Sequence, residues 1–209
     1  MVNNSKIRHY KNKKENFNMP ALFRKIANFI LDIFETLVIA LSIFLIVYLF
    51  LLQPHQVNGQ SMEPTFQDGD YVLTDKISYK LGNPERGDVV VFRAPPGANC
   101  PVGTGCDFIK RIIALPGEMV EINNDQFFIN SLPLDEDYLS EGVKTDSGQF
   151  TNDGVVQLGS NEYFVVGDNR PYSSDSRVWG PIDKSMIVGK AFFRYWPSES
   201  VGVIQSAEY

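Results

Sequence analysis

The sequence predicts a mainly β protein, in which one N-terminal transmembrane helix is followed by an antiparallel, barrel-like domain. Two observations carry this prediction. A charge-free apolar run, residues 37–52, lies near the N-terminus. Beyond it, short segments of β-branched and aromatic residues are separated by turn formers. With 209 residues, 44% of them apolar and 21% charged, the chain has room for one medium-sized domain plus an anchor.

The apolar run is interpreted as a membrane anchor. Counted back to Ile33 it reaches the ~20 residues needed to cross a ~30 Å hydrocarbon core. A buried core helix is one alternative, but the run has no polar stripe that could face water. A cleaved signal peptide is another, but residues 53–57 offer no small-x-small cleavage site. Residues 29–52 are therefore predicted to form an uncleaved transmembrane signal anchor.

The distribution of charge predicts the orientation of this anchor. Residues 1–28 contain seven basic residues and one acidic residue, whereas residues 53–209 contain 12 basic and 22 acidic residues. By the positive-inside rule, residues 1–28 form a basic cytoplasmic segment and residues 53–209 form an exported domain on the extracytoplasmic side of the cell membrane. The acidic balance of that domain argues against nucleic acid as a partner.

The exported domain is predicted to be a closed or partly closed antiparallel β-barrel. Runs typical of strands are separated by Gly-Asp, Pro-Gly and Asn-Asp turn signals. A polar stretch, residues 123–160, is interpreted as an excursion inserted in the core of this domain. The predicted strands are residues 71–74, 88–92, 108–115, 119–122, 127–129, 163–166 and 186–195.

The two cysteines, Cys100 and Cys106, lie in a Gly- and Pro-rich loop of the exported domain, where a disulfide can persist. Spacing alone leaves a disulfide and two free thiols equally open. Two cysteines do not make a zinc site by themselves, and no neighbouring histidine or acidic set completes one. We expect no metal and no cofactor.

A serine and a lysine are the candidate catalytic pair. Ser61 follows the apolar run by nine residues, and serine needs a neighbouring base to become a nucleophile. His55, the one histidine of the exported domain, is expected to be solvated where the chain leaves the membrane. Lys110 shares a strand face with Phe108 and Ile112, where burial would lower its pKa. Taken singly, Ser61 could be turn chemistry and Lys110 a solvated strand lysine.

Four segments taken together favour a catalytic site. They are residues 58–65, 86–92, 110–118 and 167–180. Their order along the chain resembles that of signal peptidase I, and the likeness covers the anchor and most of the exported domain, excluding residues 123–160. The resemblance implies that Ser61 is the nucleophile and Lys110 the general base. It also implies that Ser173 helps to orient the lysine amine, and that Asp175 and Arg177 shape the site through an ion pair.

The resemblance also bears on substrate binding. Gly59 stands where some members of the family have a serine that donates to the oxyanion hole, so the hole here would rely on backbone N–H groups such as that of Ser61. The family cuts after Ala-x-Ala-like sequences, whose alternate side chains enter two shallow apolar pockets. The apolar positions that match these pockets are Val57, Met62, Phe66, Phe108 and Ile109. The alternative is that these residues belong to the ordinary hydrophobic core of the barrel.

The resemblance predicts a membrane-bound serine endopeptidase that removes N-terminal signal peptides from exported preproteins through an acyl-enzyme. Its expected partners are preprotein signal peptides and the lipid bilayer. Trp196 is expected either at the lipid interface or in the core. Two alternatives stay open. One is a related serine–lysine maturation peptidase with a narrow client, and the other is a membrane-tethered β-domain that binds exported peptides without cutting them.

Overall fold

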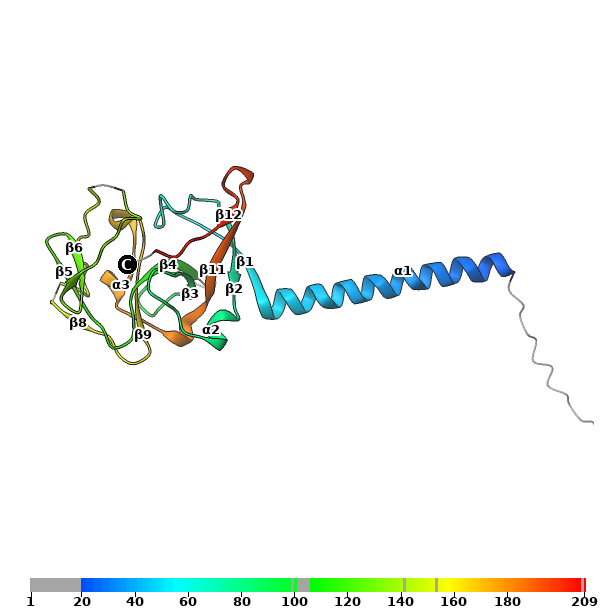
Figure 1. Cartoon of the computed structure of the whole chain (residues 1–209), viewed down its shortest axis with the longest axis horizontal. Helices are drawn as coiled ribbons and strands as arrows, with labels where there is room; N and C mark the ends of the chain where they lie inside the picture. Colours follow the sequence, from blue (N-terminus) through cyan, green and yellow to red (C-terminus); the bar gives the residue numbers. More distant parts are fainter. Residues whose placement is uncertain (1–19, 99, 101–105, 141, 153, 208) are drawn as a thin grey trace, which may run out of the picture. The chain divides into compact units, whose positions relative to one another are not determined.

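The structure is a computed structural model that describes residues 20–98, 100, 106–140, 142–152, 154–207 and 209. Most of the predicted basic segment, residues 1–19, lies outside the described residues, as do residues 101–105 between the two cysteines. The chain divides into two units, residues 1–45 and 46–209. Figure 1 shows an extended helix in the first unit and a mainly β domain in the second.

Helix α1 (Ala21–Ile46) contains nearly all of the described residues of the first unit and ends one residue beyond it. It begins after Pro20, whose carbonyl accepts the first intrahelical hydrogen bond, from the N–H of Arg24 at 3.2 Å. None of its residues is buried, and among the described residues it is the one helix long and apolar enough to cross a membrane. The apolar sequence continues past its end, through a π-helical turn (Val47–Leu51), into the first strand.

The larger sheet contains eight antiparallel strands within the described residues, in the order β1-β2-β11-β3-β4-β9-β10, with β12 paired to β11. The sheet is strongly curled. Strands β1 and β4 are separated in it by β2, β11 and β3, and yet His55 of β1 lies 3.5 Å from Asp107 of β4. Its strands are β1 (Leu52–Gln56), β2 (Tyr71–Asp75), β3 (Val89–Arg93), β4 (Asp107–Ala114), β9 (Glu162–Val166), β10 (Ile182–Asp183), β11 (Ile187–Trp196) and β12 (Gly202–Val203).

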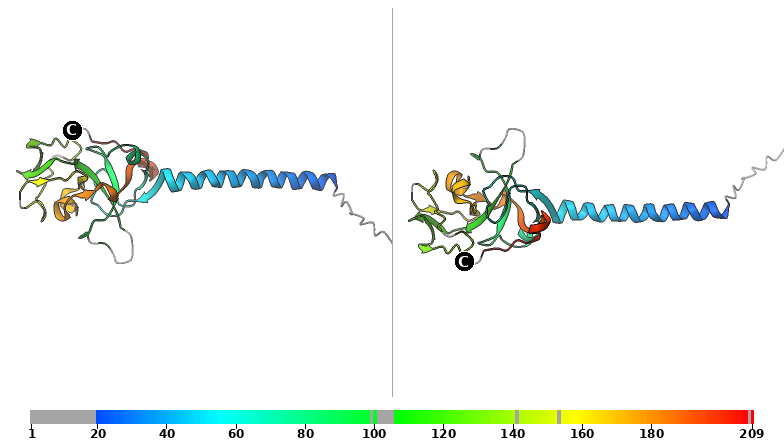
Figure 2. Two further views of the ribbon diagram at one scale, coloured as in Figure 1. Left: turned by 90° about the horizontal axis from the view of Figure 1, so that it is seen from below. Right: turned by 90° about the horizontal axis from the view of Figure 1, so that it is seen from above.

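A second, four-stranded sheet has the order β7-β6-β5-β8 in the described chain. Strands β5 (Met119–Asn123) and β6 (Gln126–Ile129) are joined by Asn124 and Asp125, both at positive φ, as a two-residue hairpin turn requires. Strands β7 (Leu132–Pro133) and β8 (Val156–Gln157) complete it, so part of the polar stretch 123–160 is strand. Within the β domain, β5, β6 and β8 lie at the end opposite β1 and β2 (Figures 1 and 2).

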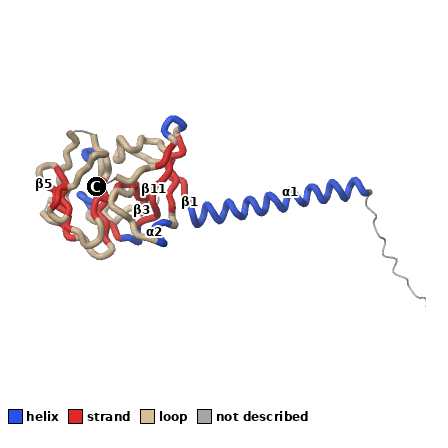
Figure 3. The backbone as a smooth tube through the Cα atoms, in the orientation of Figure 1, coloured by secondary structure: helices blue, strands red, loops and turns tan. Residues whose placement is uncertain are grey.

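Helices of the β domain are short, as the tube view shows (Figure 3). They are α2 (Ser78–Leu81), α3 (Ser176–Trp179) and the 3-10 turns Arg170–Tyr172, Lys184–Met186 and Ser198–Ser200.

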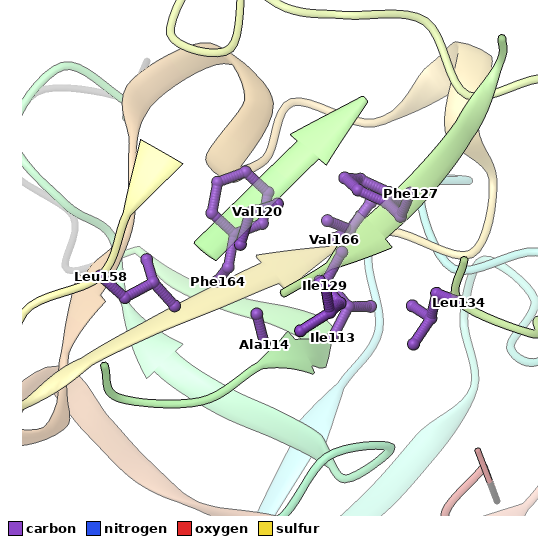
Figure 4. Close-up of a cluster of buried hydrophobic side chains, with 9 residues drawn as sticks. All are labelled: Ile113, Ala114, Val120, Phe127, Ile129, Leu134, Leu158, Phe164 and Val166. Atoms are coloured by element: carbon purple, nitrogen blue, oxygen red, sulfur yellow. The ribbon is translucent and has the colours of Figure 1, made fainter. Parts of the chain in front are cut away.

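The hydrophobic core explains why several strands read as continuous apolar runs. Strand β3 is buried on both faces: Val89 and Val91 pack in one cluster with Val57, and Val90 and Phe92 pack in another. A third cluster joins the two sheets, and its side chains converge from β4, β5, β6 and β9 (Figure 4). Strand β4, which carries the candidate base, is thus held on one side by β3 and on the other, from Arg111 onward, by β9.

Candidate active site

Ser61 and Lys110 lie together although 49 residues separate them in the chain. Ser61 belongs to the loop between β1 and β2, and Lys110 is the fourth residue of β4. The ammonium nitrogen Nζ of Lys110 donates to Oγ of Ser61 at 2.6 Å and to the carbonyl of Ile109 at 2.9 Å. The 2.6 Å between Nζ of Lys110 and Oγ of Ser61 is within the range for direct proton transfer between a hydroxyl and a base.

The loop that carries Ser61 is closed at its base by paired backbone hydrogen bonds. The N–H of Val57 donates to Asp70 O at 2.8 Å, and that of Gly69 donates to Val57 O at 2.9 Å. Gly59 has φ +89°, which favours glycine, and its N–H donates to Oδ1 of Asp68 at 2.7 Å. The Gly59 N–H is therefore engaged in holding the loop.

The turn after β9 holds the other side of Ser61. The backbone N–H of Asn169 donates to the Ser61 carbonyl at 3.0 Å, and its side-chain amide donates to Gln60 O at 3.0 Å. Gly167 lies so close that a Cβ there would overlap the Ser61 carbonyl oxygen and Oγ of Ser173. Glycine at this position therefore permits the contact between the turn and the Ser61 loop.

Arg111, the neighbour of Lys110, binds the same turn from the opposite face of β4. Its Nε and Nη2 donate to the two carboxylate oxygens of Asp168 at 2.9 and 2.7 Å, and both side chains are buried. Thr65, four residues after Ser61, also donates to Asp168. A buried bidentate pair is geometrically specific, so it fixes β4, the Ser61 loop and the turn after β9 relative to one another.

The surroundings of Lys110 shift its protonation toward the neutral form. Its side chain is only 4% exposed, and the loss of hydration lowers the pKa of the amine to about 8. The carboxylates of Asp175 and Asp168 act in the opposite direction on this pKa, and Arg177 reinforces the lowering. Burial is the dominant cause, as the sequence analysis expects for a lysine on this strand face.

Asp175 and Arg177 form a buried ion pair, with Arg177 Nε and Nη2 each 2.8 Å from the Asp175 carboxylate. Asp175 also accepts from the N–H of Gly167 at 3.1 Å, which ties the pair to the turn that contacts Ser61. Oγ of Ser173 is buried beside Gly167, but within the described residues it makes no hydrogen bond, to Lys110 or to any other group. The predicted orienting role of Ser173 stays a prediction.

A cavity of about 220 Å³ opens beside the serine and lysine. Of the five predicted substrate-binding residues, Val57, Phe108 and Ile109 line it, whereas Met62 and Phe66 are fully buried in the core cluster that contains Val57. Sequence analysis did not single out Val72, Val91, Asp107 and Ser174, which line the cavity as well.

The expectation of a solvated His55 is wrong. Its side chain is 15% exposed, lines the cavity and contacts Thr74. The signal that could have found it is the alternation of strand side chains, because His55 lies two residues before Val57 and Asp107 two residues before Ile109.

Two further features settle alternatives left open by the sequence. Cys100 and Cys106 are joined by a disulfide, with their Cα atoms 5.9 Å apart. Trp196 is 56% exposed and forms a shallow surface hollow with Tyr71 and Tyr195. Burial of Trp196 in the core is therefore excluded, and contact with lipid stays a prediction.

A serine hydroxyl hydrogen-bonded to a buried lysine amine, in a β domain that follows an apolar helix, places the chain in the class of membrane-anchored serine hydrolases. Comparison with known proteins identifies the family. The profile described as "Signal peptidase, peptidase S26" matches residues 30–196, and the chain belongs to this family. It is thus an enzyme, a hydrolase of the signal peptidase I type.

Two curated relatives support this assignment. The chain is 36% identical to "Signal peptidase IB" of Staphylococcus aureus (strain COL), over 80% of this chain and 90% of the relative. It is also 36% identical to "Probable signal peptidase I-2" of Synechocystis sp., over 83% and 77% of the two chains. A crystal structure of a signal peptidase I from Enterococcus faecalis is 32% identical, covers 51% of this chain and 95% of its own, and has a TM-score of 0.41.

Proposed function

We propose that this chain is a membrane-bound serine endopeptidase that cuts signal peptides from exported preproteins after Ala-x-Ala-like sites, with Ser61 as nucleophile and Lys110 as general base. The observation that carries the assignment of roles is the 2.6 Å contact from Nζ of a buried Lys110 to Oγ of Ser61. Family membership supplies the class of reaction, the removal of signal peptides.

In the proposed mechanism, neutral Lys110 removes the proton of Ser61 as Oγ attacks the scissile carbonyl carbon. The tetrahedral intermediate collapses when the lysine ammonium returns that proton to the leaving amine nitrogen, so the C–N bond breaks and an ester to Ser61 remains. A water molecule then gives a proton to the same amine as its oxygen attacks the ester carbonyl carbon. The lysine ammonium returns this proton to Oγ of Ser61 as the C–O bond breaks, which regenerates the serine hydroxyl and the neutral amine and frees a carboxylic acid that ionises. Every proton that leaves a nucleophile thus passes through Lys110.

The pKa of Lys110 makes this mechanism workable near neutral pH. A pKa of about 8 leaves roughly a tenth of the amine neutral at pH 7. An unperturbed lysine would have less than about one part in a thousand in that form. The difference is about 300-fold in the concentration of active base, and it comes from burial against β3 and the Ser61 loop rather than from a second catalytic group.

Free strand edges beside the cavity suit an extended substrate. Strand β1 is the edge of the larger sheet, and β9 pairs with β4 only from Arg111 onward, so the 107–110 part of β4 pairs with β3 alone in the described sheet. A peptide laid along these edges would make backbone hydrogen bonds and direct alternate side chains into the cavity.

Cleavage of a purified preprotein with an Ala-x-Ala site tests the proposal, using the full chain in detergent and sequencing the new N-terminus. We expect a cut after the second alanine, no cut by Ser61→Ala or Lys110→Ala, and normal cleavage by Ser160→Ala and Lys80→Ala, whose parent residues are exposed. Binding of the preprotein without cleavage would instead support a peptide-binding domain. Cleavage by a folded Lys110→Ala would show that another group is the base.

The membrane arrangement is proposed as well: N-terminus in the cytoplasm, a single span over α1, and the β domain on the extracytoplasmic side. The basic residues before α1 and the family assignment support it. In intact cells, protease added outside should leave the segment before Ile26 protected and reach the Cys100 loop. The opposite pattern would separate the site from its proposed substrates.

A further inference from the structure

A buried arginine connects the polar excursion, residues 123–160, to the turn that contacts Ser61. Arg170 belongs to that turn, and its side chain is 1% exposed. A guanidinium has five N–H donors, and each of those of Arg170 has an acceptor. Nε donates to the Gly167 carbonyl at 3.1 Å, and the four donors on Nη1 and Nη2 are all directed to side chains of the excursion.

Glu136 of the excursion provides the charge that balances this arginine. Its carboxylate accepts from Nη1 and Nη2 of Arg170 at 3.0 and 2.5 Å, and the acid is 10% exposed. Oγ1 of Thr145 accepts from Nη1 at 2.6 Å. The hydroxyl of Tyr138 accepts from Nη2 at 2.9 Å and donates to Glu136 at 2.7 Å. Such a planar, bidentate arrangement fixes the orientation of the guanidinium as well as its position.

The guanidinium in turn holds the backbone of the turn after β9. Its Nε donates to the carbonyl of Gly167, the residue that packs against the Ser61 carbonyl oxygen. Asn169, the neighbour of Arg170, donates its N–H to that same oxygen at 3.0 Å. The carbonyl of Arg170 also accepts from Nη2 of Arg177 at 2.7 Å. A displacement of Arg170 would therefore move both groups that contact the Ser61 carbonyl.

A second part of the excursion contacts the same support. The N–H of Phe150 donates to the carbonyl of Arg177 at 2.8 Å, and Nη1 of Arg177 donates to the carbonyl of Asp146 at 3.3 Å. The excursion thus holds the turn at two arginines. Arg170 takes its counter-charge from the excursion, whereas Arg177 is paired with Asp175. The carboxylate of Glu136 is therefore the charged link between the excursion and the site.

We propose that Glu136 is a positioning residue for the cleavage reaction: through Arg170 it holds the turn after β9 in the place that Ser61 requires. Without this carboxylate the guanidinium would be buried without a counter-charge, which is strongly unfavourable. The nearby carboxylate of Asp168 is already held by Arg111, so Arg170 could gain a new partner only if the turn moved or water entered. This inference rests on the proposed function.

The test compares Glu136→Gln with the unmodified full chain in detergent, using a preprotein with an Ala-x-Ala site. Single-turnover cleavage is measured at pH 9.5, where Lys110 is mostly neutral because its pKa is about 8. Denaturant unfolding checks that each variant is folded in the assay. A shift of about 1 Å in reacting groups can cost about 100-fold in rate. For the partial shift that loss of one carboxylate allows, we expect a rate about tenfold lower and a KM within twofold of the unmodified value.

The matched control is Asp125→Asn. Asp125 forms the exposed ion pair of the same excursion, 2.7 Å from Nζ of Lys144. Exposed pairs contribute little to stability, and this one does not contact the turn after β9 through its side chains. We expect the control to leave the single-turnover rate and the KM within twofold of the unmodified protein.

A double variant separates positioning from stability. Glu136→Leu combined with Arg170→Met replaces the ion pair by apolar side chains, which often restores the stability lost when one partner is removed. Positioning requires the Nε–H of Arg170 on the Gly167 carbonyl. The double variant should therefore be more stable than Glu136→Leu alone and yet cleave no faster. A rate that recovers together with stability would show that the pair is only structural and would overturn the inference.

Other outcomes would also overturn it. One is a folded Glu136→Gln whose single-turnover rate lies within twofold of the unmodified protein. Another is a raised KM at an unchanged single-turnover rate, because substrate binding would then be affected instead. If Glu136→Gln does not fold, Thr145→Val, which removes one neutral acceptor of Arg170, must lower the rate at least about threefold; a smaller loss counts against the inference. If the unmodified protein cuts no preprotein, the proposed function itself is refuted.

Discussion

Replacing Lys110 with methionine tests whether burial, rather than a structural ion pair, defines this lysine. Methionine fills a similar volume but cannot carry charge, so the variant should lose cleavage activity. The substitution should also remove a free-energy cost of folding, because in the folded chain the pKa of Lys110 falls from 10.5 to about 8. Below pH 8 the unfolded chain holds a proton on this amine more strongly than the folded chain does, so protonation opposes folding.

The size of this effect follows from the pKa difference. A shift of that size corresponds to about 3 kcal/mol of folding free energy, fully opposing folding below pH 8 and absent above pH 10.5. Methionine also loses the hydrogen bonds to Ser61 and Ile109, each worth about 1 kcal/mol. We therefore expect Lys110→Met to be more stable than the unmodified protein by about 1 kcal/mol at pH 7.

The assay is denaturant unfolding of the full chain in detergent, measured from pH 7 to 10.5. Other groups titrate in this range, but they are common to both proteins and cancel in the difference. The free energy of unfolding of Lys110→Met, minus that of the unmodified protein, should fall by about 3 kcal/mol as pH rises through this window. The difference should therefore change from positive to negative.

Lys190 supplies a matched control, since it is a strand lysine whose Nζ lies 2.6 Å from the buried carboxylate of Asp88. Lys190→Met should be destabilising by about 1–3 kcal/mol, because Asp88 loses its cation. A Lys110→Met variant that also lost stability at pH 7, with no dependence on pH, would show that Lys110 is a satisfied charged group and would refute its role as base.

Three further predictions concern the same site. The kcat/KM for preprotein cleavage should rise with pH through a limb near pH 8, because the active amine is neutral; a limb above pH 10 would contradict this. Gly167→Ala should lower kcat at least about tenfold in a folded protein, because the new Cβ would displace the Ser61 carbonyl, and unchanged kcat would show that the turn does not position Ser61. Arg177→Met should cost about 3–5 kcal/mol in unfolding free energy, because it leaves Asp175 buried and unpaired; a loss below 1 kcal/mol would mean that water reaches the carboxylate.

Alternation of apolar residues was enough to find the long strands but not the first one. All seven predicted strands are present as β2, β3, β4, β5, β6, β9 and β11. Strand β1 was missed because it directly follows the apolar run and contains Pro54, which argues against a central strand. Pro54 is tolerated because β1 is at the sheet edge, and edge position is a property of the assembled sheet that no local pattern reveals.

The candidate site, like the fold, could be predicted only in part. The motif around Ser61, the strand position of Lys110 and the family resemblance together singled out two groups that the structure brings within hydrogen-bond distance, and burial lowers the lysine pKa as expected. Strand alternation could have placed the His55 side chain on the face of Val57, but its proximity to Asp107 could not be predicted, because it depends on the sheet curling until β1 meets β4. The contact between Gly167 and the Ser61 loop is equally non-local. It could not be inferred from the sequence, because a glycine in a Gly-Asp-Asn turn is already expected for local reasons.

Arg177 explains in part how Lys110 keeps a low pKa beside two carboxylates. The charges of Asp175 and Asp168 raise the pKa of Lys110, and the charge of Arg177 lowers it, in the same direction as burial. Asp175, which has the larger effect of the two carboxylates, is held by Arg177 in bidentate geometry. Asp168 is held in the same way by Arg111, which strand alternation places on the face of β4 opposite its neighbour Lys110. The proposed role of Lys110 as base therefore depends in part on Arg177, a guanidinium group that makes no hydrogen bond to it within the described residues, and both ion pairs tie down the turn that contacts Ser61.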